Sequence, residues 1–320
     1  MPFTSSPVPE NLVEGRAARA SRLHSGLASV RALLVLLARG NLMMALSMAA
    51  STWLVQVFAG LPSEPLAPLL AFLVIYAIYS LDRVTELDAD GLTHPERARF
   101  SQRYARWIRH SALAAQALAL GLAATRGAWS VAVTLMPLAA LLVYSFPVLP
   151  RFLARRVGVS RLKEVFLLKN LWVAGTLTAT STLLPVVLHG GVPHGPSLLA
   201  LAAFLLGRWA LNVILFDVRD ETGDGANGLR TVPVVLGRAK TLRRLHVLNG
   251  LLVLLTVAVP LLGWARPAFV LLGVSCVYAA AYLRRAESSE DIHFLCDVVS
   301  DGEQLVLAGV VLLGTALAGA

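Results

Sequence analysis

Long apolar stretches alternate with short polar connectors along most of the chain. No stretch shows the period-two alternation of a half-buried strand, so the pattern favours helices. A helix rises 1.5 Å per residue and needs ~20 residues to cross ~30 Å of hydrocarbon, so the shorter stretches must extend into their flanks. The pattern predicts an all-α, polytopic membrane protein with nine transmembrane helices. The nine apolar stretches are 41–59, 66–81, 111–125, 131–149, 165–184, 197–216, 245–263, 268–283 and 295–318.

Composition agrees with a membrane protein and excludes several other classes. Apolar side chains make up 57% of the 320 residues, and mean hydropathy is +0.69. Only 15% of the residues are charged, against about 25% in soluble domains. An ordinary soluble enzyme, a disordered chain and a secreted disulfide scaffold are therefore excluded. Cys276 and Cys296 match neither a disulfide framework nor a metal site.

The positive charges predict an orientation and do not predict nucleic-acid binding. Net charge is +9, but the basic residues sit in short connectors and form no continuous basic face with interleaved aromatics. With the N-terminus inside, 24 of the 28 Lys and Arg residues fall on the cytoplasmic side and two, Arg126 and Arg266, on the other. We therefore expect a protein of the cell (inner) membrane with a cytoplasmic N-terminus and an external C-terminus.

The same pattern suggests how the chain is divided. Residues 1–25 are polar and predict a flexible cytoplasmic tail, and residues 26–320 predict a single transmembrane domain. Residues 26–40 fit an interfacial helix that leads into the first span. Membrane lipid is the expected surrounding, and no obligate protein partner is evident.

Acidic residues gather in two connectors that must lie on one side of the membrane. Asp82, Glu86, Asp88 and Asp90 follow the second stretch, and a second group, Asp217, Asp220, Glu221 and Asp224, follows the sixth. Four helices separate the two groups, so both emerge on the cytoplasmic side. Spacings of three and four residues put most of these carboxylates on one face of each helix.

Stacked carboxylates repel one another unless a cation compensates them. An oxygen-only ligand set suits Mg²⁺, which accepts one or two carboxylates together with substrate phosphates. Two such helix ends that meet at the mouth of a bundle predict a site for a metal-bound diphosphate. The alternative is that both groups are simply solvated loops.

The second acidic group belongs to a longer motif. Residues 216–237 read FDVRDETGDGANGLRTVPVVLG, in which Asp217, Asp220 and Asp224 precede Gly228, Thr231, Pro233 and Gly237 at fixed spacing. This run resembles the second aspartate-rich motif of the UbiA superfamily of intramembrane prenyltransferases, D-x-x-D-x-x-x-D-x-x-x-G-x-x-T-x-P-x-x-x-G. Helix number and motif placement extend the resemblance over about residues 25–318.

The first acidic group departs from the family form, N-x-x-x-D-x-x-x-D. In the register set by Asp82 and Arg83, Ile78 stands where the family has Asn, and Glu86 takes the third position. An alternative register starts at Asp82 and ends at Asp90. Losing the Asn amide removes one neutral oxygen ligand, and Glu reaches one carbon further than Asp.

The resemblance implies a UbiA-like bundle around a central cavity, with Mg²⁺ as cofactor. An isoprenyl diphosphate would place its head between the acidic helix ends, and an allylic carbocation would pass to an aromatic or other lipophilic acceptor. The implied catalytic residues are Asp82, Asp217, Asp220 and Asp224. The implied metal ligands are Asp82, Glu86, Asp90, Asp217, Asp220 and Asp224, and the expected diphosphate-binding residues are Arg83, Lys163, Asn170, Arg208 and Asn212.

Several polar residues within the apolar stretches allow two interpretations. Arg208 and Asn212 share a helix face, and either line the cavity or hydrogen-bond between helices. Lys169 either serves the site or extends to the interface. Arg219 and Arg230 assist the diphosphate or act as positive-inside anchors.

A third set of acidic positions lies in the last apolar stretch. His293, Asp297 and Asp301 step by four residues, and contact either the acceptor, the metal or a neighbouring helix. Tyr79 and Tyr144, with Tyr76, either shield a cation through their rings or anchor the interface.

Three functions fit these observations to different degrees. The first is a Mg²⁺-dependent prenyltransferase. The second is a terpene cyclase on the same scaffold, which the altered first motif leaves open. The third is an ion-coupled transporter, which is weaker because transporter sites usually lie near the bilayer midplane, whereas both acidic groups lie at helix ends.

Overall fold

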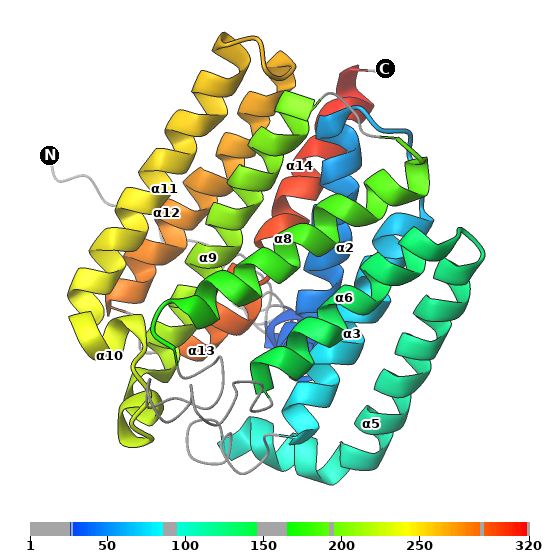
Figure 1. Ribbon diagram of the computed structural model, residues 1–320. Coiled ribbons are helices and arrows are strands. Elements are labelled where there is room, and N and C mark those ends of the chain that lie inside the picture. Colours follow the sequence, from blue (N-terminus) through cyan, green and yellow to red (C-terminus); the bar gives the residue numbers. More distant parts are fainter. Residues whose placement is uncertain are drawn as a thin grey trace, which may run out of the picture.

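The structure is a computed structural model of the 320-residue chain. It describes residues 26, 28–85, 95–145, 165–191, 195–288 and 291–318. Every secondary-structure element in these ranges is helical, which confirms the all-α prediction (Figure 1). Residues 28–39 form a helix before the first apolar stretch, and the tail proposed for residues 1–25 lies outside the described residues.

Each of the nine apolar stretches corresponds to a helical segment. Two short helices accompany them, α10 (Val232–Leu236) and α13 (Ile292–Phe294), together with a 3₁₀ segment, η2 (Pro267–Leu272), and a π-helix, η3 (Leu295–Ser300). The long helices are α2 (Leu42–Ala59), α3 (Leu66–Thr85), α5 (Pro95–Ala124), α6 (Ala128–Ser145), α8 (Leu168–His189), α9 (Gly195–Ala226), α11 (Arg238–Leu261), α12 (Gly273–Ser288) and α14 (Glu303–Ala318).

Within the described ranges, seven helical segments are long and apolar enough to cross a membrane. The two other long helices differ for physical reasons. The first half of α5 carries many basic residues, and α14 has only 16 residues because the π-helix η3 interrupts the apolar stretch before it. The protein is therefore a polytopic helical membrane protein, and the count of nine spans stays a prediction.

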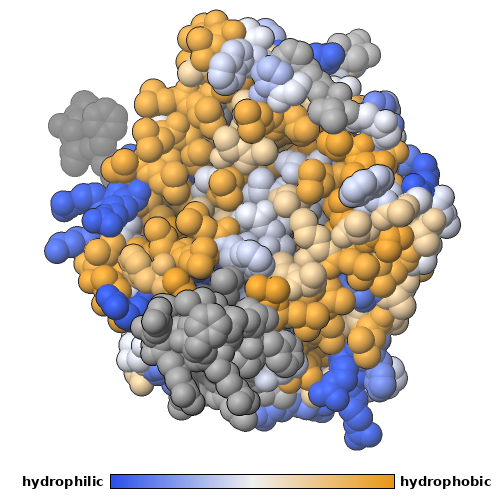
Figure 2. All heavy atoms as spheres, viewed as in Figure 1, coloured by the Kyte–Doolittle hydropathy of each residue, from blue (hydrophilic) through white to orange (hydrophobic). Residues whose placement is uncertain are grey.

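Helices that follow one another along the chain mostly pack side by side. α3 packs against α2 and α5, α8 packs against α6 and α9, and α11 packs against α9 and α12. The last helix, α14, packs against α2 and closes the bundle (Figure 1). The face in Figure 2 is largely apolar, with strongly hydrophilic side chains near its edges, as expected for a surface that contacts hydrocarbon.

Helix length carries the second acidic motif out of the apolar bundle. α9 has 32 residues, and at 1.5 Å per residue it is about 48 Å long, well over the ~30 Å of a hydrocarbon core. Its last turns, which contain Asp220 and Asp224, therefore extend past the apolar layer. α3 ends at Thr85, three residues after Asp82, and the C-terminal ends of both helices lie on the same side of the bundle (Figure 1).

Candidate active site

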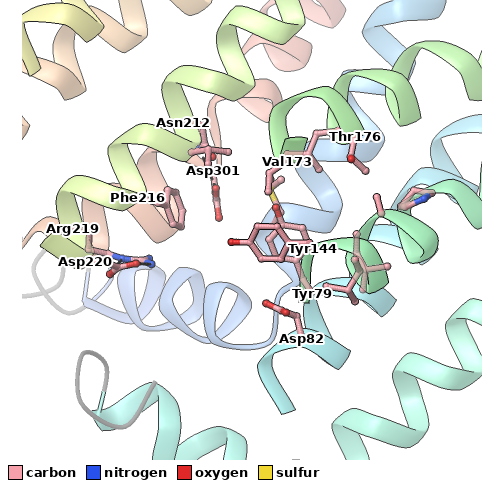
Figure 3. A pocket seen from close by; sticks show the side chains of 17 residues that line it. Tyr79, Asp82, Tyr144, Val173, Thr176, Asn212, Phe216, Arg219, Asp220 and Asp301 are labelled. Atoms are coloured by element: carbon pink, nitrogen blue, oxygen red, sulfur yellow. Dashed lines mark hydrogen bonds and ion pairs between the residues drawn. The ribbon is translucent and has the colours of Figure 1, made fainter. Parts of the chain in front are cut away.

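A cavity of about 290 Å³ opens between the helices that carry the two acidic motifs. Asp82 of α3 and Asp220 of α9 both line it, although 138 positions separate them in the sequence. Figure 3 shows their side chains facing the same space from different elements. Most of the remaining wall is apolar or aromatic. We call this space the apolar cavity; its other lining residues are Met44, Ile78, Tyr79, Pro137, Ala140, Leu141, Tyr144, Val173, Thr176, Leu177, Asn212, Val213, Phe216, Arg219 and Asp301.

A smaller and more polar space of about 170 Å³ adjoins the apolar cavity. Three arginines line it, Arg83, Arg97 and Arg219, so it presents positive charge beside the acidic groups. We call this space the polar vestibule. Six residues line both spaces: Met44, Tyr79, Asp82, Phe216, Arg219 and Asp301.

The three aspartates of the second motif have different surroundings. Asp220 faces the apolar cavity, and its two carboxylate oxygens accept hydrogen bonds of 2.8 Å from Arg219 Nε and Nη2. Asp217 lines neither space and is buried against α8. There it accepts a 2.7 Å hydrogen bond from Asn170 Nδ2 and pairs with Lys169 Nζ at 2.8 Å. Asp224 lies 3.9 Å from the same Lys169 Nζ.

Lys169 and Asn170 both contact Asp217 in this structure. The side chain of Lys169 is only 14% exposed, so it lies within the bundle and does not extend to the interface. Asn170 was expected at the diphosphate, but its amide donates to the Asp217 carboxylate.

The first motif is described only in part. Asp82 lines both spaces, and Arg83 lines the vestibule and donates a hydrogen bond to the backbone carbonyl of Arg39. Glu86 and Asp90, expected to be metal ligands, lie outside the described residues, as does Lys163, expected at the diphosphate.

Arg208 and Asn212 share a helix face but have different roles. Asn212 lines the apolar cavity, as expected, and donates hydrogen bonds to Ser300 and Asp301. Arg208, in contrast, is not among the described residues that line the cavity or the vestibule. Its guanidinium pairs with Glu303 and donates to Asn249 Oδ1 at 2.7 Å and to Tyr282 Oη at 3.1 Å. Of the two interpretations of Arg208, the structure therefore favours hydrogen bonding between helices, and its expected contact with the diphosphate stays a prediction.

Arg219 lies within the site. Its guanidinium bridges Asp220 of its own helix and Asp297 of η3, and sits 4.4 Å from the centre of the Phe216 ring. Arg219 lines both spaces, and its role towards a diphosphate stays a prediction.

Some residues at or near the site had no recognisable signal in the sequence. Phe216, Val173 and Thr176 line the cavity, but each looks like an ordinary member of an apolar stretch. Glu303 was equally hidden, because its partner Arg208 lies 95 positions away. Asp301 did have a signal, the spacing of four from Asp297.

The carboxylates of the site are hard oxygen donors, and no cysteine or histidine occurs among the described residues that line the two spaces. Within the described ranges, no three acidic, histidine or cysteine side chains form a ready metal cluster. A divalent ion here would therefore take one carboxylate from each motif and complete its shell with water and phosphate oxygens, as Mg²⁺ prefers.

A helical membrane bundle with carboxylates and arginines at the mouth of an apolar cavity defines a class of intramembrane enzyme for amphiphilic anionic substrates. The model of the UbiA prenyltransferase family matches residues 43–295, and the chain belongs to this family of prenyl-transferring enzymes. No curated protein sequence matches the chain.

Solved structures share the fold at low sequence identity. A UbiA homologue from Archaeoglobus fulgidus bound to GPP and Mg²⁺ has a TM-score of 0.59 and 16% identity, over 86% of this chain and 99% of the homologue. The apo structure of a UbiA homologue from Aeropyrum pernix K1 has a TM-score of 0.60 and 16% identity, over 86% and 97% of the two chains. A structure of the Archaeoglobus fulgidus homologue with DMAPP and Mg²⁺ has a TM-score of 0.56 and 17% identity, over 87% and 99%.

Proposed function

We propose that this protein catalyses the Mg²⁺-dependent transfer of an isoprenyl group from an isoprenyl diphosphate to a lipophilic acceptor within the membrane. Family membership supports prenyl transfer, and the fold is shared with homologues bound to GPP or DMAPP and Mg²⁺. The acceptor is an aromatic ring or another electron-rich group that reaches the cavity from the lipid phase.

One observation carries the proposal more than any other. Asp82 of the first motif and Asp220 of the second line the same cavity, and Arg219 stands beside them. Carboxylates in this position would hold a divalent ion, whereas the arginines would hold the anionic head of the donor. Ordinary solvated loops give no reason for both motifs to meet over an apolar cavity.

The donor set fits Mg²⁺. We expect Asp82 and Asp220 to hold the ion, with Asp224 at the edge of the same group. Glu86 and Asp90 remain candidate ligands from the sequence. Bound Mg²⁺ would neutralise the negative charge that builds on the leaving diphosphate.

The side chains of the two spaces bind different parts of the donor. Arg83, Arg97 and Arg219 in the vestibule bind the diphosphate through charge-assisted hydrogen bonds. Apolar side chains such as Ile78, Val173 and Phe216 surround the isoprenyl chain and exclude water. Water exclusion matters because an allylic cation in a wet site is lost to hydrolysis.

The proposal includes an orientation. The acidic helix ends and the basic connectors lie on the cytoplasmic side, where a soluble diphosphate is available, and the positive-inside pattern of the sequence supports this arrangement. Residues 26–320 form one catalytic domain in this scheme, with residues 1–25 as a cytoplasmic tail.

Purified protein in lipid nanodiscs, given Mg²⁺ and C5 to C20 isoprenyl diphosphates, tests the proposal. We expect diphosphate release that rises when a membrane lipid extract supplies the acceptor, and a prenylated product by mass spectrometry. A cyclised hydrocarbon from the donor alone would indicate a cyclase instead. Absence of donor binding at every chain length, together with ion flux in proteoliposomes, would indicate a transporter.

A further inference from the structure

Asp301 occupies a distinctive place between the two spaces. It lies between η3 and α14, its residue is 9% exposed, and it lines both the apolar cavity and the polar vestibule. Figure 3 shows its carboxylate extending into the cavity from the Asn212 side, towards the space near Tyr79 and Tyr144. Burial of a carboxylate costs free energy unless other groups compensate its charge, so the position of Asp301 at this boundary needs a physical explanation.

Among the described residues, hydrogen-bond donors reach only one of the two carboxylate oxygens of Asp301. Oδ1 accepts a 3.2 Å hydrogen bond from Asn212 Nδ2, and the backbone carbonyl of Asp301 accepts one from Ser47 Oγ. Oδ2 accepts no hydrogen bond from any described residue. The side chain is thus fixed in direction, while one oxygen keeps its lone pairs available to the cavity.

The backbone around Asp301 is held firmly. The π-helix η3 ends at Ser300, and π-helical turns occur frequently at functional sites because they redirect side chains. Two residues later, Glu303 forms the buried pair with Arg208 that joins this segment to α9. An anchored carboxylate needs little reorganisation when charge develops near it, which is the condition for electrostatic catalysis.

The two spaces differ in charge, so they favour different parts of a bound donor. The arginines of the vestibule favour the diphosphate, and the apolar cavity favours the isoprenyl chain, so the carbon that joins the two lies at the boundary, where Asp301 stands. The other charged residues that line one or both of these spaces are Asp82, Asp220, Asp297, Arg83, Arg97 and Arg219.

We propose that Asp301 is a catalytic residue whose carboxylate faces the reacting C1 carbon of the donor and stabilises the positive charge that develops there. This inference rests on the proposed prenyl transfer. In the step concerned, the bond between C1 and the bridging oxygen breaks, both bonding electrons leave with the diphosphate, and no proton moves. The developing allylic cation then has a fixed anion beside it in a medium of low dielectric constant.

This role has a kinetic signature that other roles lack. A carboxylate near the donor repels the diphosphate in the ground state and attracts C1 in the transition state. Removal of its charge should therefore slow the reaction without weakening donor binding. A metal ligand would do the reverse, because its loss weakens donor binding and raises the Mg²⁺ requirement. A purely structural residue would lower thermal stability along with every kinetic parameter.

The test uses geranyl diphosphate labelled with ¹⁸O in the bridging position. If the C1–O bond breaks and reforms, the label scrambles into the non-bridging oxygens, so the exchange rate reports bond cleavage without any acceptor. Asp301→Asn is compared with wild type and with Asp291→Asn. The latter removes a carboxylate from the same segment at a site outside both spaces, where Asp291 caps α13. Donor dissociation constant, Mg²⁺ midpoint and melting temperature are measured on the same nanodisc samples.

We expect Asp301→Asn to slow isotope exchange about 100-fold, the usual loss for one preorganised electrostatic contact. Donor affinity should be equal or tighter, the Mg²⁺ midpoint unchanged, and Asp291→Asn like wild type. Unchanged exchange in Asp301→Asn, or a raised Mg²⁺ midpoint, would overturn the inference. It would also be overturned by a wild type that binds the donor without any exchange, whereas a wild type that binds no donor would overturn the proposed function itself.

Discussion

Two arginine–carboxylate groups on α9 lie eleven residues apart and illustrate two uses of buried charge. Arg208 pairs with Glu303, and the two side chains are only 1% and 6% exposed. Arg219 pairs with Asp220 and Asp297, whose side chains are 25% and 26% exposed and line the cavity or the vestibule. The first group joins helices, and the second faces the space for a substrate.

The difference lies in how completely each group is satisfied. Asn249 and Tyr282 hydrogen-bond to Arg208 and Glu303, and neither member of this pair is among the described residues that line the cavity or the vestibule. Arg219 pairs with Asp220 and Asp297 at the edge of an open space. An incoming metal ion and diphosphate would separate Arg219 from Asp220 and take over both charges. Helix position alone, without partners, does not distinguish these two cases.

The largest expected effect is the loss of turnover when a carboxylate of the group at the cavity is removed. Asp220→Asn removes a carboxylate that we assign to Mg²⁺, so we expect turnover of geranyl diphosphate to fall by about 1,000-fold, or ~4 kcal/mol of transition-state stabilisation. The melting temperature should change little, because the side chain is partly exposed.

The neighbouring Glu221→Gln is the matched control for Asp220→Asn. It changes the same charge on the next residue of the helix, and Glu221 is not among the described residues that line the two spaces. Equal activity in the two variants would show that Asp220 has no special role.

The helix-joining side of the comparison should respond in stability. Arg208→Met leaves the Glu303 carboxylate buried without its partner, and we expect a loss of about 3 kcal/mol in the free energy of unfolding. The double variant Arg208→Met with Glu303→Met should recover much of this loss, since no buried charge remains. Thermal unfolding in detergent measures both, and a double variant less stable than either single one would contradict the structural assignment.

The sequence predicted the elements better than their partners. Apolar stretches and acidic clusters are local signals, so the helices and the meeting of Asp82 with Asp220 could be predicted. The helix ends were predicted less accurately. The helix α5, for example, includes the basic residues of 95–110, which have no apolar periodicity.

The residues whose interpretation the sequence left open depended on distant contacts. The sequence did not reveal that Glu303 is the partner of Arg208, and it left both interpretations of Lys169 open because the contact of Lys169 with Asp217 is tertiary. The resemblance to a family motif identified the acidic residues of α9 but carried no information on which of them faces the cavity. Asp217 does not line it, whereas Asp220 does.

A glycine lies between the aspartate that lines the cavity and the glutamate that joins the helices, so a substitution there should affect both. At Gly302, between Asp301 and Glu303, an added Cβ would lie 2.7 Å from the carbonyl oxygen of Val298 and 3.3 Å from Met43 Cε. Gly302→Ala should therefore cost about 2 kcal/mol of stability and reduce activity as well. The comparison variant is Gly309→Ala, where nothing lies within 4 Å of the added atom. Thermal unfolding that is the same for both variants would contradict the close packing.

The smallest expected effect concerns Lys169, which contacts Asp217 and Asp224. Because its ammonium would compete with a metal ion for the Asp224 carboxylate, Lys169→Met should lower the half-saturating Mg²⁺ concentration about fivefold, or ~1 kcal/mol. Lys169→Arg keeps the charge and should stay near wild type. Titration of Mg²⁺ at fixed geranyl diphosphate measures the shift. A raised Mg²⁺ requirement in Lys169→Met would mean that the lysine supports the metal site instead of competing with it.

Calorimetric titration of geranyl diphosphate into the nanodisc-embedded protein, with Mg²⁺ or with EDTA, tests directly whether the two acidic motifs form one metal–diphosphate site. We expect saturable binding with Mg²⁺, and loss of that binding with EDTA and in both Asp82→Asn and Asp220→Asn. Binding of equal strength without Mg²⁺, or in both variants, would show that the carboxylates of the two motifs do not form a shared metal–diphosphate site.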